Sequence, residues 1–181
     1  MKVIPTGLPG VLVLEPRVFP DARGFFFESH NRRGFREATG VDVEFVQDNH
    51  SRSARHALRG LHYQISQPQG KLVRVVAGEV FDVAVDLRRS SPAFGKWTGV
   101  ALSAESKRMV WIPGGFAHGF LVLSEQADLL YKATDYYAPA HERTLLWNDP
   151  QLGIRWPLGQ EPLLADKDRR GAALAAAEVY P

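Results

Sequence analysis

The chain contains no cysteine among its 181 residues. This absence excludes a disulfide framework, thiol catalysis and thiolate metal ligands, and it fits a reducing compartment. No apolar run approaches the roughly 20 residues that span a bilayer, and the N-terminal segment has no long apolar core after a basic run. Membrane insertion and secretion are therefore disfavoured, and we expect a cytoplasmic protein.

The chain also lacks an excess of charge of either sign. Its 22 Lys and Arg residues stand against 20 Asp and Glu residues, and the formal net charge is only +2. Because the charges are interspersed, no broad basic surface for nucleic acid is expected, although a local arginine pair for a small anion is. The hydrophobic content of 45% is enough for a substantial core. We expect one domain over residues 1–181 that binds a small molecule rather than nucleic acid or a membrane.

Short strand-like segments separated by turn residues dominate the pattern. Gly78 supplies the positive φ that a tight hairpin uses, so residues 72–87 are expected to form an antiparallel pair. Two helices are expected, one near 33–38 and one over 169–178, where alanines favour helix. This pattern predicts an all-β antiparallel jelly roll. The ten expected strands are 11–14, 25–28, 44–49, 58–63, 72–76, 80–87, 97–102, 109–112, 119–123 and 128–136.

Several of these strands carry polar residues where a plain β core would be apolar. A histidine can act as a general base when its ring is held, so His62 is the leading candidate base; the alternative is a structural histidine. The company of Arg59 and Lys71 favours catalysis. Lys71 is either a solvated residue at a strand start or a fixed cation that stabilises an oxyanion. Asp82 and Asp86 alternate with apolar residues and project either to a barrel mouth or to solvent.

The segment PGGFAHGF, residues 113–120, resembles the second cupin motif, whose histidine points into the mouth of a jelly-roll barrel. In metal-dependent cupins the first motif supplies two histidines separated by one residue and then a carboxylate. Here Gln64 occupies the second histidine position, and no acid lies between His62 and Lys71. A cation beside two histidines without an anionic ligand is a poor metal site, so we expect neither a metal nor another cofactor.

Eight segments in the same order resemble the dTDP-4-dehydrorhamnose 3,5-epimerase family, over about residues 19–168. The resemblance implies a cofactor-independent homodimer with a cupin-like jelly roll. It further implies inversion of carbons 3 and 5 of dTDP-4-dehydro-6-deoxy-D-glucose to give dTDP-4-dehydro-L-rhamnose. The segments are RGFFFE (23–28), QDNHS (47–51), RGLHYQ (59–64), GKLVR (70–74), FDVAVDLR (81–88), PGGFAHGF (113–120), LYK (130–132) and WNDP (147–150).

The resemblance also implies catalytic roles. His62 is the base and is oriented by Asp168, a pairing that favours the imidazolium formed after proton abstraction. Lys71 neutralises the enolate oxygen, and Tyr131 returns the proton. Taken alone, Asp168 is an N-cap or first-turn acid of the C-terminal helix, and Tyr131 is core or interface packing.

The same resemblance implies a set of substrate contacts. Arg23 and Arg59 form a diphosphate clamp, because guanidinium groups match phosphate oxygens, and Tyr137 lies against the sugar. Family sites can draw residues from the partner subunit, so Arg23 or Glu28 serves either its own pocket or its neighbour's. A core, structural or solvated role is the alternative for these residues. The remaining implied contacts are Phe19, Phe26, Gln47, Asp48, Asn49, His118, Glu142 and Lys167.

Three rival functions are left open by the residues. One is a single-site epimerase of deoxysugars, which would share His62, Lys71 and Asp168. Another is a metal cupin such as a dioxygenase or a phosphosugar isomerase. A third is a non-catalytic sugar-binding cupin, although binding alone does not need a base beside a cation.

Overall fold

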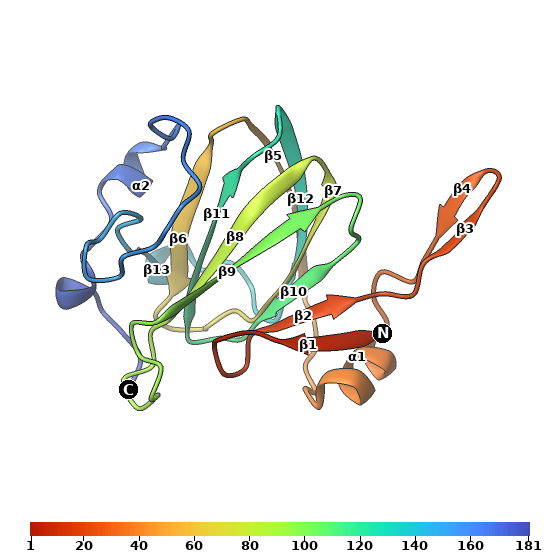
Figure 1. The fold of residues 1–181 in the computed structure, drawn as a ribbon. Coiled ribbons are helices and arrows are strands. Elements are labelled where there is room, and N and C mark those ends of the chain that lie inside the picture. The colour runs from red at the N-terminus through yellow and green to blue at the C-terminus, as the bar shows by residue number, and fades with distance from the viewer.

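The computed structural model describes all residues 1–181 and contains two large antiparallel sheets (Figure 1). The six-stranded sheet runs, from edge to edge, through β1 (Lys2–Pro5), β2 (Leu12–Glu15), β10 (Met109–Ile112), β7 (Lys71–Ala77), β12 (Gln126–Ala133) and β5 (Gln47–Ala54). The five-stranded sheet runs through β13 (Glu142–Thr144), β6 (Leu58–Gln64), β11 (Phe116–Val122), β8 (Glu79–Asp86) and β9 (Trp97–Ser103). The predicted all-β antiparallel class is confirmed.

The main hydrophobic core lies between the two sheets. Val73 and Leu129 of the six-stranded sheet belong to the same buried cluster as Val80 and Phe120 of the five-stranded sheet. Burial of these alternating residues is what specifies the inward face of each strand. Further apolar clusters cover both outer faces, so each sheet is enclosed on two sides over part of its area.

A third, small sheet stands apart from this body. The strands β3 (Phe19–Asp21) and β4 (Gly24–Phe26) pair as a hairpin. The hairpin projects away from both large sheets in Figure 1, and all six of its strand residues are exposed. Side chains on this hairpin therefore have few neighbours within their own chain.

The helix α1 (Arg32–Thr39) confirms the first predicted helix. The Asn31 side chain caps its N-terminus by accepting a hydrogen bond from the Gly34 amide, and Gly40 ends it in the left-handed conformation. Phe35 is buried against Trp111 on the outer face of the six-stranded sheet. No helix in the structure is long and apolar enough to cross a membrane.

The predicted C-terminal helix over 169–178 is wrong. The structure has a four-residue helix α2 (Asp166–Arg169), then a 3-10 turn η2 (Leu174–Ala176). Between them the Ala172 backbone bonds to Thr144 and Leu146, and the Leu174 amide donates to the Asp149 carboxylate. These long-range hydrogen bonds, with burial of Leu174 on the five-stranded sheet, outweigh the modest helix propensity of the alanines.

The predicted hairpin pairing over 72–87 is also wrong, although its turn is present. Gly78 has a φ of +75°, as a tight turn requires. However, β7 pairs with β10 and β12, whereas β8 pairs with β11 and β9. The turn thus carries the chain from one sheet to the other, which lets both strands bury their inward residues in one core.

Every predicted strand overlaps an observed one; the strand 109–112 matches β10 at both ends, and the others have shifted ends. β12 stops at Ala133 rather than continuing to 136, and β5 begins at Gln47 rather than 44. The strands β1, β3 and β13 were not expected. Each has three or four residues, so periodicity has too few positions to register them.

A close approach of β6 and β11 shapes the middle of the five-stranded sheet. Gly60 has a φ of +111°, and a Cβ there would lie 2.6 Å from the His118 carbonyl oxygen. The pairing register shifts between His118 and Phe120. Glycine is therefore required between Arg59 and His62 for the strands to pack at this bulge.

Candidate active site

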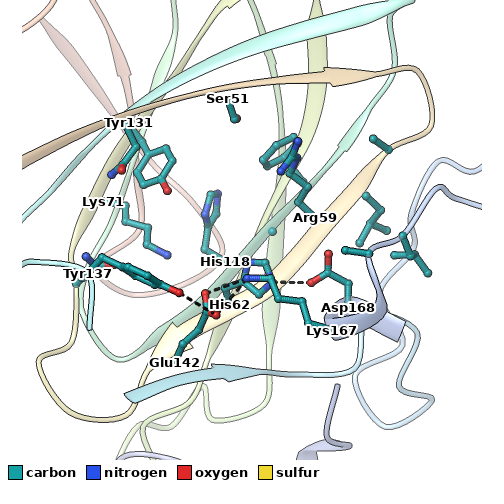
Figure 2. Close-up of a pocket in the computed structure, with 18 of the residues that line it drawn as sticks. Ser51, Arg59, His62, Lys71, His118, Tyr131, Tyr137, Glu142, Lys167 and Asp168 are labelled. Atoms are coloured by element: carbon teal, nitrogen blue, oxygen red, sulfur yellow. Dashed lines mark hydrogen bonds and ion pairs between the residues drawn. The ribbon is translucent and has the colours of Figure 1, made fainter. Parts of the chain in front are cut away.

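A pocket of about 590 Å³ opens between the two sheets (Figure 2). Strands of both sheets, the segment before α2 and α2 itself contribute to its walls. Eleven of the residues expected at a site line it. They are Gln47, Asn49, Arg59, His62, Lys71, His118, Tyr131, Tyr137, Glu142, Lys167 and Asp168.

His62 and Asp168 form a hydrogen-bonded pair in this pocket. The His62 Nε2 lies 2.6 Å from the Asp168 Oδ1, and the Asp168 side chain is only 2% exposed. Asp168 is in the first turn of α2, but its carboxylate binds the imidazole and the helix has no side-chain cap. When the Nε2–H donates a hydrogen bond to this carboxylate, the neutral ring leaves its Nδ1 unprotonated and free to accept a proton.

A second histidine–aspartate pair stands beside the first. His118 lies directly across from His62 in the β6–β11 pairing, and its Nε2 is 2.9 Å from the Oδ2 of buried Asp82. Sequence reasoning left the direction of Asp82 open, and only the pairing of β8 with β11 brings it behind His118. Asp86 instead binds Arg88 and Ser91, away from the pocket.

Lys71 and Tyr131 come from the opposite sheet, on β7 and β12. Burial lowers the pKa of Lys71 to about 8, and the carboxylates of Asp82 and Glu142 only partly offset this effect. Burial raises the pKa of Tyr131, and Glu142 adds to the rise. At neutral pH the lysine is thus a cation, while the tyrosine keeps the proton that it could donate.

Strand β5 presents a row of polar side chains to the pocket at alternate positions. The Gln47 Nε2 donates to the Asn49 Oδ1 over 2.9 Å. The Nδ2 of Asn49 and the Oγ of Ser51 are buried without a hydrogen-bond partner. Buried polar atoms are rarely left unpaired, so these two are suited to a ligand. Ser51 was not expected, although its spacing of two from Asn49 on a strand places both on one face.

Arg59 is held in place by the same strand. Its Nε donates to the Ser53 Oγ over 2.8 Å, and its terminal nitrogen donates to the Arg52 carbonyl over 3.2 Å. No carboxylate pairs with the guanidinium, so its charge is available to an anion in the pocket.

Three residues form a cluster at the mouth of the pocket. The Tyr137 hydroxyl donates to the Glu142 Oε2 over 3.3 Å, and the Lys167 Nζ lies 3.1 Å from both Glu142 oxygens. Figure 2 shows the Tyr137 ring extending toward Glu142. The cluster joins β13, through Glu142, to α2, through Lys167, which directly precedes Asp168.

Five expected contacts lie outside this pocket. Phe19, Arg23 and Phe26 are on the exposed hairpin, where Arg23 pairs with Asp21. Glu28 follows the hairpin and is exposed. Asp48 points to the other face of β5 and binds Lys132, next to a second pocket of about 250 Å³.

No three histidine, cysteine, aspartate or glutamate side chains come together as a set that could hold a metal ion. His62 and His118 each engage an aspartate. Gln64, at the position of the second cupin histidine, bonds to backbone groups of neighbouring segments. These three side chains therefore already have protein partners.

The profile of the dTDP-4-dehydrorhamnose 3,5-epimerase family matches residues 5–176. The chain belongs to this family. A dTDP-4-dehydrorhamnose 3,5-epimerase of Pseudomonas aeruginosa is 65% identical over 181 residues, with all of both chains covered. The resemblance expected from the eight sequence segments is thereby confirmed.

Solved structures of epimerases share the fold. A dTDP-6-deoxy-D-glucose-3,5-epimerase of Legionella pneumophila in complex with dTDP-4-keto-L-rhamnose has a TM-score of 0.96 and 52% identity, covering 98% of this chain and 94% of that one. A 3'-monoepimerase of Streptomyces bikiniensis in complex with dTDP-quinovose has a TM-score of 0.90 and 40% identity, covering 97% and 88%. The cupin-like jelly roll is therefore common to epimerases named for two inversions and for one.

Proposed function

We propose that this chain is a dTDP-4-dehydrorhamnose 3,5-epimerase that converts dTDP-4-dehydro-6-deoxy-D-glucose to dTDP-4-dehydro-L-rhamnose. The observation that carries the proposal is the pairing of groups across the pocket. His62, backed by Asp168, comes from the five-stranded sheet, and Lys71 and Tyr131 come from the six-stranded sheet. A base and an acid on opposite walls is the arrangement that inversion of a carbon requires.

The first chemical step is removal of a proton next to a ketone. The carbonyl at carbon 4 of the sugar acidifies the hydrogens on carbons 3 and 5, because the electron pair left behind is delocalised onto oxygen. In this proposal the His62 Nδ1 accepts that proton, and the Asp168 carboxylate stabilises the resulting imidazolium. The C–H electron pair becomes the enolate, with negative charge on the carbon-4 oxygen.

The second step returns a proton to the opposite face. The Lys71 ammonium stabilises the enolate oxygen in a water-poor site, where a fixed cation is most effective. Tyr131 then donates its proton to the carbon and becomes a tyrosinate. Solvent returns a proton to the tyrosinate and removes the proton from the His62 imidazolium, which restores both groups. Repeating the cycle at the other carbon completes the double inversion.

The polar groups around these residues suit a nucleotide diphosphate sugar. Arg59 offers a guanidinium with no carboxylate partner for the diphosphate, and the unpaired donors of Asn49 and Ser51 face the same cavity. Tyr137 lies at the mouth, where it is proposed to contact the sugar. In this proposal His118 binds the carbon-4 oxygen together with Lys71.

The test is proton NMR of dTDP-4-dehydro-6-deoxy-D-glucose in deuterated water with chelator-treated enzyme. Deuterium is expected at both carbons 3 and 5, since each is deprotonated and then reprotonated from solvent-exchanged groups. Deuterium at one carbon only would replace the proposal with a single-site epimerase. No incorporation, with binding retained, would make the chain a binding protein, and activity restored only by a metal would revive the metal-cupin alternative.

We further propose that the chain acts as a homodimer in which the β3–β4 hairpin reaches the neighbouring subunit's pocket. Phe25 and Phe26 of the hairpin are 57% and 70% exposed, and exposed aromatic groups of this kind favour a protein interface. Arg23 does not line the pocket of its own chain, its side chain is 90% exposed, and its only ionic partner is Asp21. A second copy supplies the site that these residues lack.

Mixed dimers test this arrangement. Arg23→Ala and His62→Ala chains, each inactive alone, are co-expressed and the heterodimer activity is measured. If Arg23 serves the partner, one site per heterodimer is complete, and statistical mixing restores about a quarter of wild-type activity. Absence of any restoration would place Arg23 in its own chain's site, and a monomer in light scattering would refute the dimer.

A further inference from the structure

Gln64 occupies the position where a metal cupin carries its second histidine, yet it serves the backbone of another loop. The residue is only 4% exposed. Its Oε1 accepts from the Ala138 amide over 2.9 Å, and its Nε2 donates to the carbonyls of Gln67, over 2.8 Å, and Tyr136, over 3.3 Å. Gln64 therefore holds the backbone on both sides of Tyr137.

The loop that carries Tyr137 is fixed by glutamines at every residue. The Tyr137 amide donates to the Gln47 Oε1 over 2.9 Å, and the Gln69 Nε2 donates to the Asp135 carbonyl over 2.8 Å. With the two bonds from Gln64, residues 135–138 each give one backbone group to a glutamine side chain. The Tyr137 residue, by contrast, is 51% exposed, and its hydroxyl donates to the Glu142 carboxylate.

Such a loop combines a fixed backbone with an aromatic ring left open at the pocket mouth. Its own side-chain packing cannot account for this order, because Tyr136 and Tyr137 are both exposed. An aromatic ring held before ligand arrives loses little conformational entropy on binding, which improves affinity. Of the glutamines that bond this loop, Gln47 and Gln69 line the pocket and Gln64 does not.

We propose that Gln64 is a positioning residue for Tyr137, which it presents as a preformed contact surface for the sugar of a deoxythymidine diphosphate sugar. The inference rests on the proposed function for the identity of the ligand. It assigns the glutamine at the second cupin position a role in substrate affinity, exerted through the loop it binds and without contact with the substrate.

The test is a double-mutant cycle that uses dTDP-glucose, a stable nucleotide sugar, as the calorimetric probe. Gln64→Met removes all three hydrogen bonds and keeps a side chain of similar size. It is expected to weaken binding roughly 3- to 10-fold, the effect of freeing one ordered side chain. In a Tyr137→Ala background the same change is expected to have no further effect. In kinetics, KM should rise by the same factor while kcat stays within about twofold.

Controls separate positioning from general damage. Tyr136→Ala removes the neighbouring exposed tyrosine and should leave binding unchanged. Gln64→Asn, which keeps the amide donor and acceptor but draws them back from the loop by one methylene, should lie between wild type and Gln64→Met, and it provides the test if Gln64→Met does not fold. An equal loss in both Tyr137 backgrounds, or no loss in either, would overturn the inference. A wild-type protein that fails to bind dTDP-glucose would overturn the proposed function as well.

Discussion

His62→Ala is expected to lower kcat/KM by about 10²- to 10⁴-fold, the usual contribution of a general base. The substitution removes the imidazole that is paired with Asp168 and is the proposed acceptor of the proton from carbon 3 or 5, and the other pocket imidazole, His118, is bonded to Asp82 instead. The proposed diphosphate contacts are untouched, so affinity for dTDP-glucose should stay near the wild-type value. Deuterium incorporation at both carbons, followed by NMR, measures the lost step directly.

His141→Ala is the matched control for this variant. His141 lies in the 3-10 turn η1 (Pro139–His141) and does not line the pocket, so its removal should leave kcat/KM within about twofold. Unchanged deuterium exchange in a folded His62→Ala protein would show that another group is the base.

Lys71→Met is expected to lower kcat by about 10²- to 10³-fold, as removal of a group that stabilises an oxyanion does. Its ammonium is the pocket cation on β7, and burial has already stripped much of the water that would otherwise compete for its charge. Substrate binding should change less than turnover, because the enolate oxygen is fully charged only after proton abstraction. Steady-state kinetics on the purified variant separates kcat from KM.

The pH dependence provides an independent reading of the same lysine. Because the pKa of Lys71 is about 8, the free enzyme loses this cation as the pH rises through 8, and kcat/KM should fall on the alkaline side. Arginine stays charged beyond pH 12, so Lys71→Arg should lose that limb even if its activity is low at every pH. If kcat/KM of Lys71→Arg still fell at alkaline pH as in the wild type, the group that titrates there would not be Lys71.

Loss of the Lys71 charge at alkaline pH should raise the free energy of unfolding, whereas it should lower the activity. The pKa of Lys71 lies below its ordinary value of 10.5, so the unfolded chain binds more protons than the folded chain between about pH 8 and 10.5. The buried cation therefore costs folding free energy in full below pH 8, and the cost is relieved as pH rises toward 10.5. Lys71→Met should be more stable than wild type at pH 7 in urea unfolding, with a smaller gain at pH 10.

Local patterns in the sequence predicted the strands and much of the site. Short strand-like segments between turn residues indicated ten strands, and glycine indicated the Gly78 turn, which the structure contains. His62, Lys71 and Arg59 stood out because charged groups on strand segments conflict with an apolar core. These conclusions depend on neighbours in the chain, and periodicity and turn chemistry encode such neighbours well.

Only the tertiary structure decided which strands pair and what each polar residue faces. Asp82 meets His118 across 36 positions of sequence, and Asp168 meets His62 across 106, a pairing that the family resemblance implied but that the residues alone did not. The Gly78 turn joins two sheets rather than two partners, and the alanine-rich end of the chain packs as loops instead of a helix. In each case the deciding free energy comes from hydrogen bonds and burial between distant segments. Local propensity is too weak to override those contacts and carries no information about which segments will meet.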